Sequence, residues 1–271
     1  MSKLISILVV CLNPGKKINT TLDSIKDQSF SDYEVIVKDG LSTDGTLETL
    51  KEYEDMGIKV ISRKDSGIYD AMNQAIEHAE GRYIYFLNCG DKFHDSEVLK
   101  HVAEAADENP SIIYGNIFEM KTGTFVSQNP EIDGFACYRN VPCHQACFYT
   151  KELVKEHPFE LEYKVRADYE QFLWCFYKGN AAFKYVDYPI ASYEGDGYSE
   201  SKEGIKLSSM EHKLITQKYM DAKDIRCYKI KLALTLAPVR RALANNKTTA
   251  KLYNGIKNSI YGKKNENTMG R

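Results

Sequence analysis

Four polar segments in the first hundred residues each follow an apolar run, at the points where predicted strands end. They contain groups that bind cations or phosphates, namely Asn13, Asp39, residues 63–65 and residues 88–91. A divalent cation held by carboxylates neutralises a pyrophosphate and stabilises it as a departing group. Asp91 directly follows an apolar run, and Gly90 allows the backbone to approach phosphate oxygens. Alternatively, Asp91 only caps the following helix, because Asp is a favoured N-cap residue.

Several other binding chemistries are disfavoured. The sequence has no GxxxxGK[ST] motif, and no GxGxxG motif follows the first predicted strand, which argues against a P-loop and against a dinucleotide fold. The seven cysteines form no CxxC pair and indicate a reduced, cytoplasmic setting. Cys143, His144 and Cys147 lack a second ligand pair at zinc spacing, so a structural zinc site is not expected.

Alternating strands and helices must position these residues. Strands are predicted at 4–12, 33–38, 58–62 and 82–87, and the continuous apolar run at 4–12 is typical of a buried parallel strand. A helix at 68–79 is expected to bury Ile68, Met72, Ala75, Ile76 and Ala79. Other helices are predicted after the N-cap candidates Ser42, Thr43 and Asp44, and over residues 97–106. This order favours a parallel sheet with helices on both faces, whose ligands gather beyond the carboxyl ends of the strands.

The pattern changes after Pro110. A hairpin is predicted over 112–118 and 124–126, then short strands at 146–149 and 182–186. Between them a helix at 165–178 is expected to turn Tyr169, Leu173 and Phe176 inward. Residues 195–199 contain two glycines, which fit either a hinged loop or an ordinary turn. Beyond residue 201 the pattern is helical.

The C-terminal segment is strongly basic. From Ile225 onward eleven Lys and Arg residues face a single acid, Glu266. Basic amphipathic helices lie on anionic membrane surfaces, which predicts a peripheral position on the inner face of the plasma membrane. The alternatives are a helical pair packed on the catalytic body and a dimer contact. No apolar run reaches the ~20 residues that span a bilayer.

Five stretches together resemble the family-2 glycosyltransferases of the GT-A fold. They are VKDGLSTDGT (37–46), DSGIYDAMNQAI (65–76), GRYIYFLNCGD (81–91), HQACFY (144–149) and RADYE (166–170). They are most similar to the branch that builds bacterial capsule, O-antigen and exopolysaccharide units. The resemblance implies an α/β fold with a mainly parallel central sheet flanked by helices. It predicts a catalytic domain at 1–200, with a nucleotide-sugar half at 1–110 and an acceptor half at 111–200, and a basic helical extension at 201–271.

The resemblance also implies roles for the polar residues. Those expected to bind the donor are Asn13, Asp39, Arg63, Asp65, Gly67, Asp70, Asn73, Asn88 and Gly90. Asp91 stands where the family's Asp-x-Asp motif ends and is the expected Mn²⁺ or Mg²⁺ ligand. Asn88 replaces the first aspartate of that motif, so it brings no charge to the metal.

In the second half the resemblance assigns Asp168 as the catalytic base, which takes the acceptor hydroxyl's proton in an inverting transfer. Glu170 is the competing acid, predicted to face away. His144 and Gln145 are expected on the acceptor or metal side, and Ser199 in the closing loop. The other histidines lack such context and are expected at the surface; they are His78, His94, His101, His157 and His212.

Together these observations predict a cytoplasmic hexosyltransferase that moves a sugar from a nucleotide diphosphate, with UDP favoured, to a glycan or polyprenyl-linked acceptor. Nucleic acid is not an expected partner. Two alternatives stay open. One is a non-catalytic subunit that binds nucleotide sugar or membrane, which the Asn88 departure keeps in consideration. The other is a sugar nucleotidyltransferase, for which the sequence lacks a glycine-rich, basic triphosphate loop.

Overall fold

The computed structural model describes residues 3–195 and 201–234. The chain divides into two compact units, residues 1–219 and residues 220–271. Helix α8 (Lys202–Tyr219), which falls in the predicted extension, therefore belongs to the first unit. Within the described residues, no helix is both long enough and apolar enough to cross a membrane.

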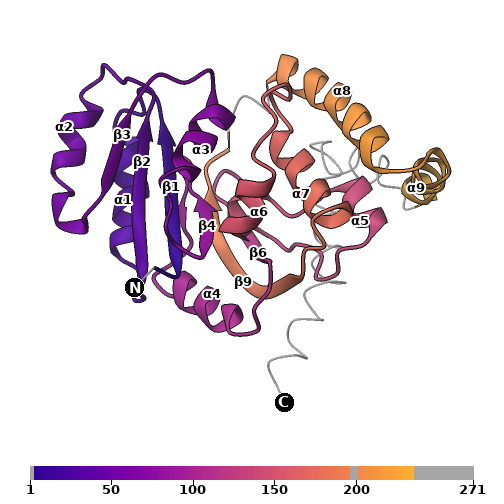
Figure 1. Cartoon of the computed structure of the whole chain (residues 1–271), viewed down its shortest axis with the longest axis horizontal. Helices are drawn as coiled ribbons and strands as arrows, with labels where there is room; N and C mark the ends of the chain where they lie inside the picture. Colours follow the sequence, from indigo (N-terminus) through magenta and orange to yellow (C-terminus); the bar gives the residue numbers. More distant parts are fainter. Residues whose placement is uncertain (1–2, 196–200, 235–271) are drawn as a thin grey trace. The chain divides into compact units, whose positions relative to one another are not determined.

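The predicted parallel sheet is confirmed in the first half of the chain (Figure 1). Its strands run side by side in the order β3 (Lys59–Ser62), β2 (Tyr33–Asp39), β1 (Ile5–Cys11) and β4 (Tyr83–Phe86). Every residue of β1 is buried, as its continuous apolar run predicts. The helices between and after these strands are α1 (Lys17–Lys26), α2 (Thr46–Lys51), α3 (Ile68–Ile76) and α4 (Val98–Ala106).

The second half extends the same sheet with mixed directions. Its strands are β5 (Lys92–Phe93), β6 (Ile112–Glu119), β7 (Thr124–Val126), β8 (Cys147–Thr150) and β9 (Phe183–Tyr193). The sheet continues from β4 through β8, β6 and β9 to β5, and β7 pairs with β6. β8 is antiparallel to both of its neighbours, whereas β6 and β9 are parallel. The predicted hairpin at 112–126 and the short strand near 146–149 are therefore confirmed.

The prediction of a short last strand at 182–186 is wrong, because β9 continues to Tyr193. The register between β6 and β9 shifts twice around Asn116, and Pro189 pairs with Asn116 there. Gly115 allows the close approach, since a Cβ at that position would lie 2.6 Å from the Tyr188 carbonyl oxygen. This irregularity breaks the alternation of apolar and polar residues that would reveal the full strand.

Smaller predictions also need correction. Ile68 is 47% exposed, because it is the first residue of α3 and precedes the buried stripe. The N-cap of α2 is Gly45, with φ 87°, and the Asp44 carboxylate instead accepts from the Thr46 and Gly15 amides. Phe176 is only half-buried. Elements that the sequence pattern did not predict are β5, α5 (Gly134–Arg139), α6 (Lys151–Glu156), and the 3₁₀ turns η1 (Glu54–Met56) and η2 (His144–Ala146).

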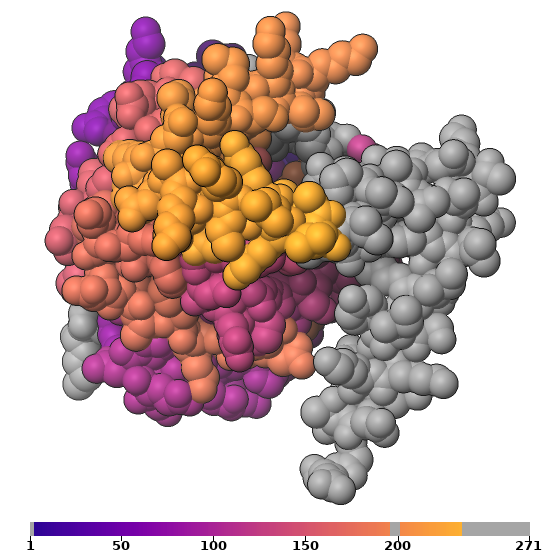
Figure 2. All heavy atoms as spheres, turned by 90° about the vertical axis from the view of Figure 1, so that its right-hand side faces the viewer, coloured from indigo at the N-terminus to yellow at the C-terminus, as the bar shows by residue number. Residues whose placement is uncertain are grey.

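The last described elements carry charge and apolar side chains at the surface. Helix α8 exposes Ile205, Met210 and Leu214, and it contributes to the face shown in Figure 2. In the second unit, α9 (Ala222–Leu234) has no buried residue. All seven cysteines are free thiols; Cys227 on α9 is exposed, and the other six are buried or half-buried.

Candidate active site

The carboxyl ends of the first three strands meet, as predicted. Cys11, Asp39 and Ser62 are register partners across β1, β2 and β3. Asn13 ties the first two loops together, because its side-chain oxygen accepts from the Thr43 amide at 2.8 Å. Asn13 itself has a φ of 49°, a conformation that Asn adopts more readily than most residues.

Asp39 is fully buried at this edge. Its carboxylate accepts hydrogen bonds from the Leu41 and Ser42 amides and from the Ser62 hydroxyl. Burial raises the pKa of Asp39, but the hydrogen bonds from Ser42 and Ser62 outweigh it, so the pKa lies below its ordinary value. The site therefore has a fixed negative charge at the end of β2.

A buried ion pair supports the next loop. The Lys38 ammonium is fully buried and lies 2.7 Å from the Asp65 carboxylate. It also donates to the carbonyl oxygens of Asp39 and Arg63, so one cation joins β2 to residues 63–65. Asp65 is thus held by the protein, whereas the Arg63 side chain lies along α3 with its Nε 3.0 Å from Gln74.

The predicted donor-side residues of α3 mainly organise the helix. Gly67 is its N-cap, with φ 138°, a conformation that favours glycine. Burial raises the pKa of Asp70, but its carboxylate accepts from the amide and hydroxyl of Ser66, and hydrogen bonds of this kind leave the pKa below its ordinary value. Asn73 pairs its amide group with both the N–H and the carbonyl of Phe159. The structure thus gives Asn73 a backbone partner rather than an open position.

The loop after β4 contains the predicted metal residues. Asp91 is 5% exposed, and its carboxylate accepts from the Gln145 side chain at 3.2 Å and from the Glu194 amide at 2.9 Å. Burial raises the pKa of Asp91. The side-chain oxygen of Asn88 is buried and, within the part of the chain that the structure describes, has no hydrogen-bond partner.

Gln145 contacts one of the two predicted carboxylates, and His144 lies within the electrostatic influence of the other. Gln145 contacts Asp91, as described above, and the charges of Asp91 and Asp168 both act on the neighbouring Cys143 thiol. His144 is 9% exposed and stacks on Phe86, and neither ring nitrogen has a partner among the described residues. Burial lowers the pKa of His144, although the charge of Asp168 opposes this effect. The imidazole is therefore neutral at neutral pH.

Asp168 stands in the first turn of α7 (Ala167–Tyr177). The Tyr69 hydroxyl, from the start of α3, donates to its carboxylate at 3.0 Å and also to the Val165 carbonyl at 2.9 Å. Tyr69 therefore orients this carboxylate from the opposite half of the domain. The sequence carries no signal for this contact, because the two residues are 99 positions apart.

Glu170 lies in a separate buried network. Its carboxylate is fully buried, accepts from Tyr219, and lies 2.9 Å from His157 and 2.8 Å from Lys218. The oxygens of Glu160 and Glu170 and the His157 ring are close enough to hold a metal, but the Lys218 ammonium already supplies a cation. The structure therefore does not bring Glu170 to the other site residues.

All five histidines expected at the surface are instead half-buried, His157 and His212 among them. His157 stacks on Trp174 with 4.6 Å between ring centroids, and His212 contacts the Tyr138 carbonyl at 2.9 Å. Both belong to the packing around α7 and α8. Ser199 lies outside the described residues, as does most of the predicted closing loop.

Helix α8 helps to build the site through Glu211. This carboxylate is 4% exposed and accepts from the amides of Lys164, Val165 and Arg166, at 2.7, 3.0 and 2.8 Å. These three residues directly precede α7, so Glu211 fixes the approach to Asp168. The helix predicted as an extension is thus part of the first compact unit.

We expect Glu211→Ala to destabilise the protein by about 2–4 kcal/mol, because three backbone N–H groups lose their shared, charged acceptor. Thermal or urea unfolding of the purified variant measures this loss. Glu203→Ala on the same helix is the matched control, since Glu203 is exposed. Equal stability of the two variants would contradict the role of Glu211.

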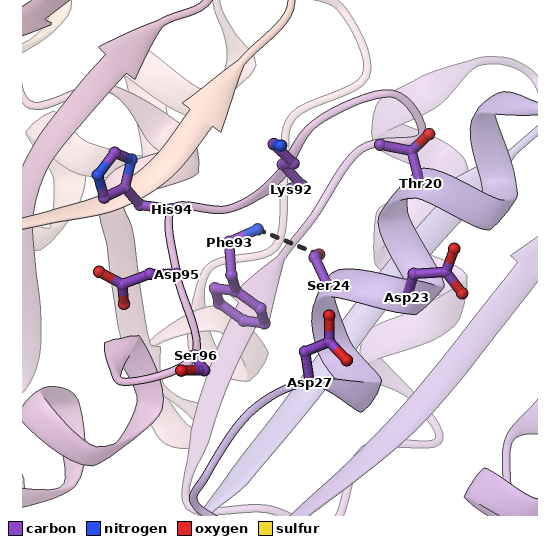
Figure 3. Close-up of a pocket in the computed structure, with 9 residues that line it drawn as sticks. All are labelled: Thr20, Asp23, Ser24, Asp27, Lys92, Phe93, His94, Asp95 and Ser96. Atoms are coloured by element: carbon purple, nitrogen blue, oxygen red, sulfur yellow. Dashed lines mark hydrogen bonds between the residues drawn. The ribbon is translucent and has the colours of Figure 1, made fainter.

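A separate group of polar residues lines a hollow. The hollow has a volume of about 370 Å³ and lies between α1 and residues 92–96 (Figure 3). Its lining includes the carboxylates of Asp23, Asp27 and Asp95 together with Lys92 and His94. None of the predicted site residues lines it, so it offers a rival position for a polar ligand.

Comparisons with known proteins identify the fold and the family. The sequence profile of "Glycosyl transferase family 2" matches residues 6–160. The PGL/p-HBAD biosynthesis glycosyltransferase of Mycobacterium bovis (strain BCG / Pasteur 1173P2) is 32% identical over 219 residues, which cover 77% of this chain and 85% of that protein.

Two solved structures have the same fold. TarS 1–349 of S. aureus in complex with UDP-GlcNAc matches with a TM-score of 0.66 and 21% identity, covering 90% of this chain and 74% of that one. In another structure of TarS 1–349, the match spans only 60% of that chain. The mannosyltransferase PcManGT of Pyrobaculum calidifontis, in complex with GDP-Man and Mn²⁺, matches with a TM-score of 0.65 and 17% identity, covering 96% and 81%. The profile match, the relative and the GT-A architecture agree that this chain belongs to glycosyltransferase family 2.

Proposed function

We propose that the protein is an inverting glycosyltransferase that moves a hexose from a nucleotide diphosphate, with UDP favoured, to a hydroxyl of a glycan or lipid-linked acceptor. The observation that carries this proposal is the convergence of Asp91 and Asp168 on residues 143–145. One carboxylate follows a sheet strand, where donors bind in such folds, and the other begins a helix of the acceptor half. The complexes of the structural neighbours with UDP-GlcNAc and GDP-Man support a nucleotide-sugar donor.

The residues present fit a divalent cation. Asp91 offers a buried carboxylate, and Asn88 offers a buried side-chain oxygen with no described partner. Oxygen ligands of this kind suit Mg²⁺ and Mn²⁺. When bound, the cation would neutralise the diphosphate of the leaving nucleotide. The Mn²⁺ in the mannosyltransferase complex supports this assignment.

We assign the role of general base to Asp168. Its carboxylate would accept the proton of the acceptor hydroxyl while that oxygen bonds to the anomeric carbon, and the bond from this carbon to the diphosphate breaks on the opposite face. Tyr69 leaves one carboxylate oxygen free to accept, because it contacts only Oδ1. The neutral, unpartnered ring of His144 is suited to hydrogen-bond a sugar or phosphate oxygen beside this base.

The class of acceptor is inferred from the basic surface of α9 and from the name of the mycobacterial relative. The mycobacterial relative is named a "PGL/p-HBAD biosynthesis glycosyltransferase". We place the present protein in surface polysaccharide assembly, peripheral to the inner face of the membrane. The basic residues of α9 support contact with anionic lipid; they are Lys223, Arg226, Lys229 and Lys231.

The first test is thermal stabilisation of the purified chain by UDP, GDP, CMP and dTDP, each with and without Mn²⁺. A metal-dependent rise in Tm with one diphosphate is expected, because a ligand that binds only the folded state stabilises it. Stabilisation that is lost in the Asp27→Asn variant would assign the ligand to the hollow of Figure 3 instead. No shift with any nucleotide would favour the non-catalytic subunit.

A further inference from the structure

Glu194 lies beside residues 88–91, the loop that contains the proposed metal ligand Asp91. It comes to this loop from the far end of the sheet. It follows β9, and its amide donates to the Asp91 carboxylate at 2.9 Å, although the two residues are 103 positions apart. β9 pairs with β5, which begins directly after Asp91, so this contact is fixed by the ladder. Backbone pairing therefore holds the Glu194 side chain beside residues 88–91.

The Glu194 carboxylate lies over Gly90. A Cβ added at Gly90 would be 2.5 Å from Glu194 Oε2, and Gly90 has a φ of 100°. The loop thus leaves room for this carboxylate by having no side chain at that position. Two carboxylates, those of Asp91 and Glu194, consequently meet at one loop, an arrangement that is unfavourable without a nearby cation.

A cation is already in contact with Glu194. The Lys17 ammonium lies 2.6 Å from Glu194 Oε2, and the two side chains are 57% and 41% exposed. An exposed pair of this kind contributes only about 0–1 kcal/mol. Lys17 is also the first residue of α1, where the helix dipole disfavours a positive charge. The ammonium is therefore a weakly held counter-ion.

We propose that Glu194 is the second carboxylate ligand of the divalent cation, and that Lys17 is the counter-ion which the metal displaces. This inference rests on the proposed function. It explains how the site keeps two negative ligands although Asn88 brings no charge, since Glu194 supplies the missing carboxylate. The ligand set is then Asp91 and Glu194, and the side-chain oxygen of Asn88, which is unpartnered among the described residues, belongs to the same loop as Asp91.

The test is direct titration of the full chain with MnCl₂, alone and with saturating UDP, with free Mn²⁺ followed by electron paramagnetic resonance. Glu194→Gln keeps the backbone N–H bond to Asp91 and removes only the charge. We expect it to raise the Kd for Mn²⁺ at least about tenfold. Lys17→Met should bind Mn²⁺ as tightly as the wild type or more tightly, because no ammonium competes. Glu203→Gln, exposed on α8, is the matched control.

Different results would contradict the metal-binding role of Glu194 and the proposed glycosyltransferase function. A Glu194→Gln Kd within twofold of the wild type, or weaker Mn²⁺ binding by Lys17→Met without nucleotide, would overturn the role of Glu194. Wild-type protein that is stabilised by UDP but binds no Mn²⁺ would also overturn it, while leaving sugar transfer in place. A wild type that binds Mn²⁺ through Glu194 but shows no nucleotide binding would instead count against the proposed function.

Discussion

Asp168→Asn is expected to lower kcat for sugar transfer by about 10²- to 10⁴-fold, the usual contribution of a general base. The amide keeps the shape of the side chain and can still accept from the Tyr69 hydroxyl, so the fold should be unchanged. It cannot take up the acceptor's proton. Nucleotide binding should persist, because the proposed donor residues follow the strands of the other half. Initial rates of nucleotide release, with thermal shift by the same nucleotide, measure both effects.

The control for this variant is Asp107→Asn, which changes an exposed acid at the C-terminal end of α4. It should transfer sugar at the wild-type rate. Tyr69→Phe should reduce the transfer rate less than Asp168→Asn does. It keeps the carboxylate of the proposed base but removes the hydroxyl that orients it. Transfer by Asp168→Asn within threefold of the wild type would remove Asp168 from the mechanism.

Asp91→Asn is expected to abolish metal-dependent nucleotide binding, with an Mn²⁺ affinity lower by on the order of a hundredfold. The same substitution should not lower the stability of the protein when no ligand is bound. Burial raises the pKa of Asp91 above its unfolded value, so the ionised carboxylate destabilises the folded state at neutral pH. Removing that charge should leave Tm unchanged or higher without ligand, while the rise in Tm with Mn²⁺ and nucleotide disappears.

Asp27→Asn is the matched control, because Asp27 lines the hollow beside α1 and not the predicted site. It should retain the full metal-dependent shift. An Asp91→Asn variant that is destabilised without ligand yet still shifts with Mn²⁺ and nucleotide would contradict this assignment of the metal.

The sequence predicts the first half of the fold well, because the central strands β1 and β4 are buried throughout and read as runs of apolar and aromatic residues. β1 is the best example, with all seven residues buried. The second half is harder to predict. β5 has only two residues, and the bulge beside Asn116 disguises the length of β9. Both elements are defined by pairing with distant strands rather than by a local pattern.

The candidate site likewise contains some residues that the sequence predicts and others that it does not. Residues that follow parallel strands, such as Asp39 and Asp91, can be predicted from the sequence, because topology brings these strand ends together. Their partners cannot, since Tyr69, Glu194 and Glu211 meet the site across long stretches of chain. A polar residue that matches a family motif can also form its hydrogen bonds within the protein. The side-chain amide of Asn73, which pairs with the backbone of Phe159, is an example.

The cysteine thiols differ in exposure, so a chemical probe can be attached selectively to one of them. Burial raises the pKa of the Cys137, Cys143 and Cys175 thiols to about 12, which keeps them protonated and unreactive at neutral pH. Cys227 is the exposed thiol among the described residues. A maleimide spin label or fluorophore would therefore attach at Cys227 without mutagenesis. Such a label stands on α9, the basic helix of the second unit, so its mobility or emission directly reports contact between that helix and lipid vesicles.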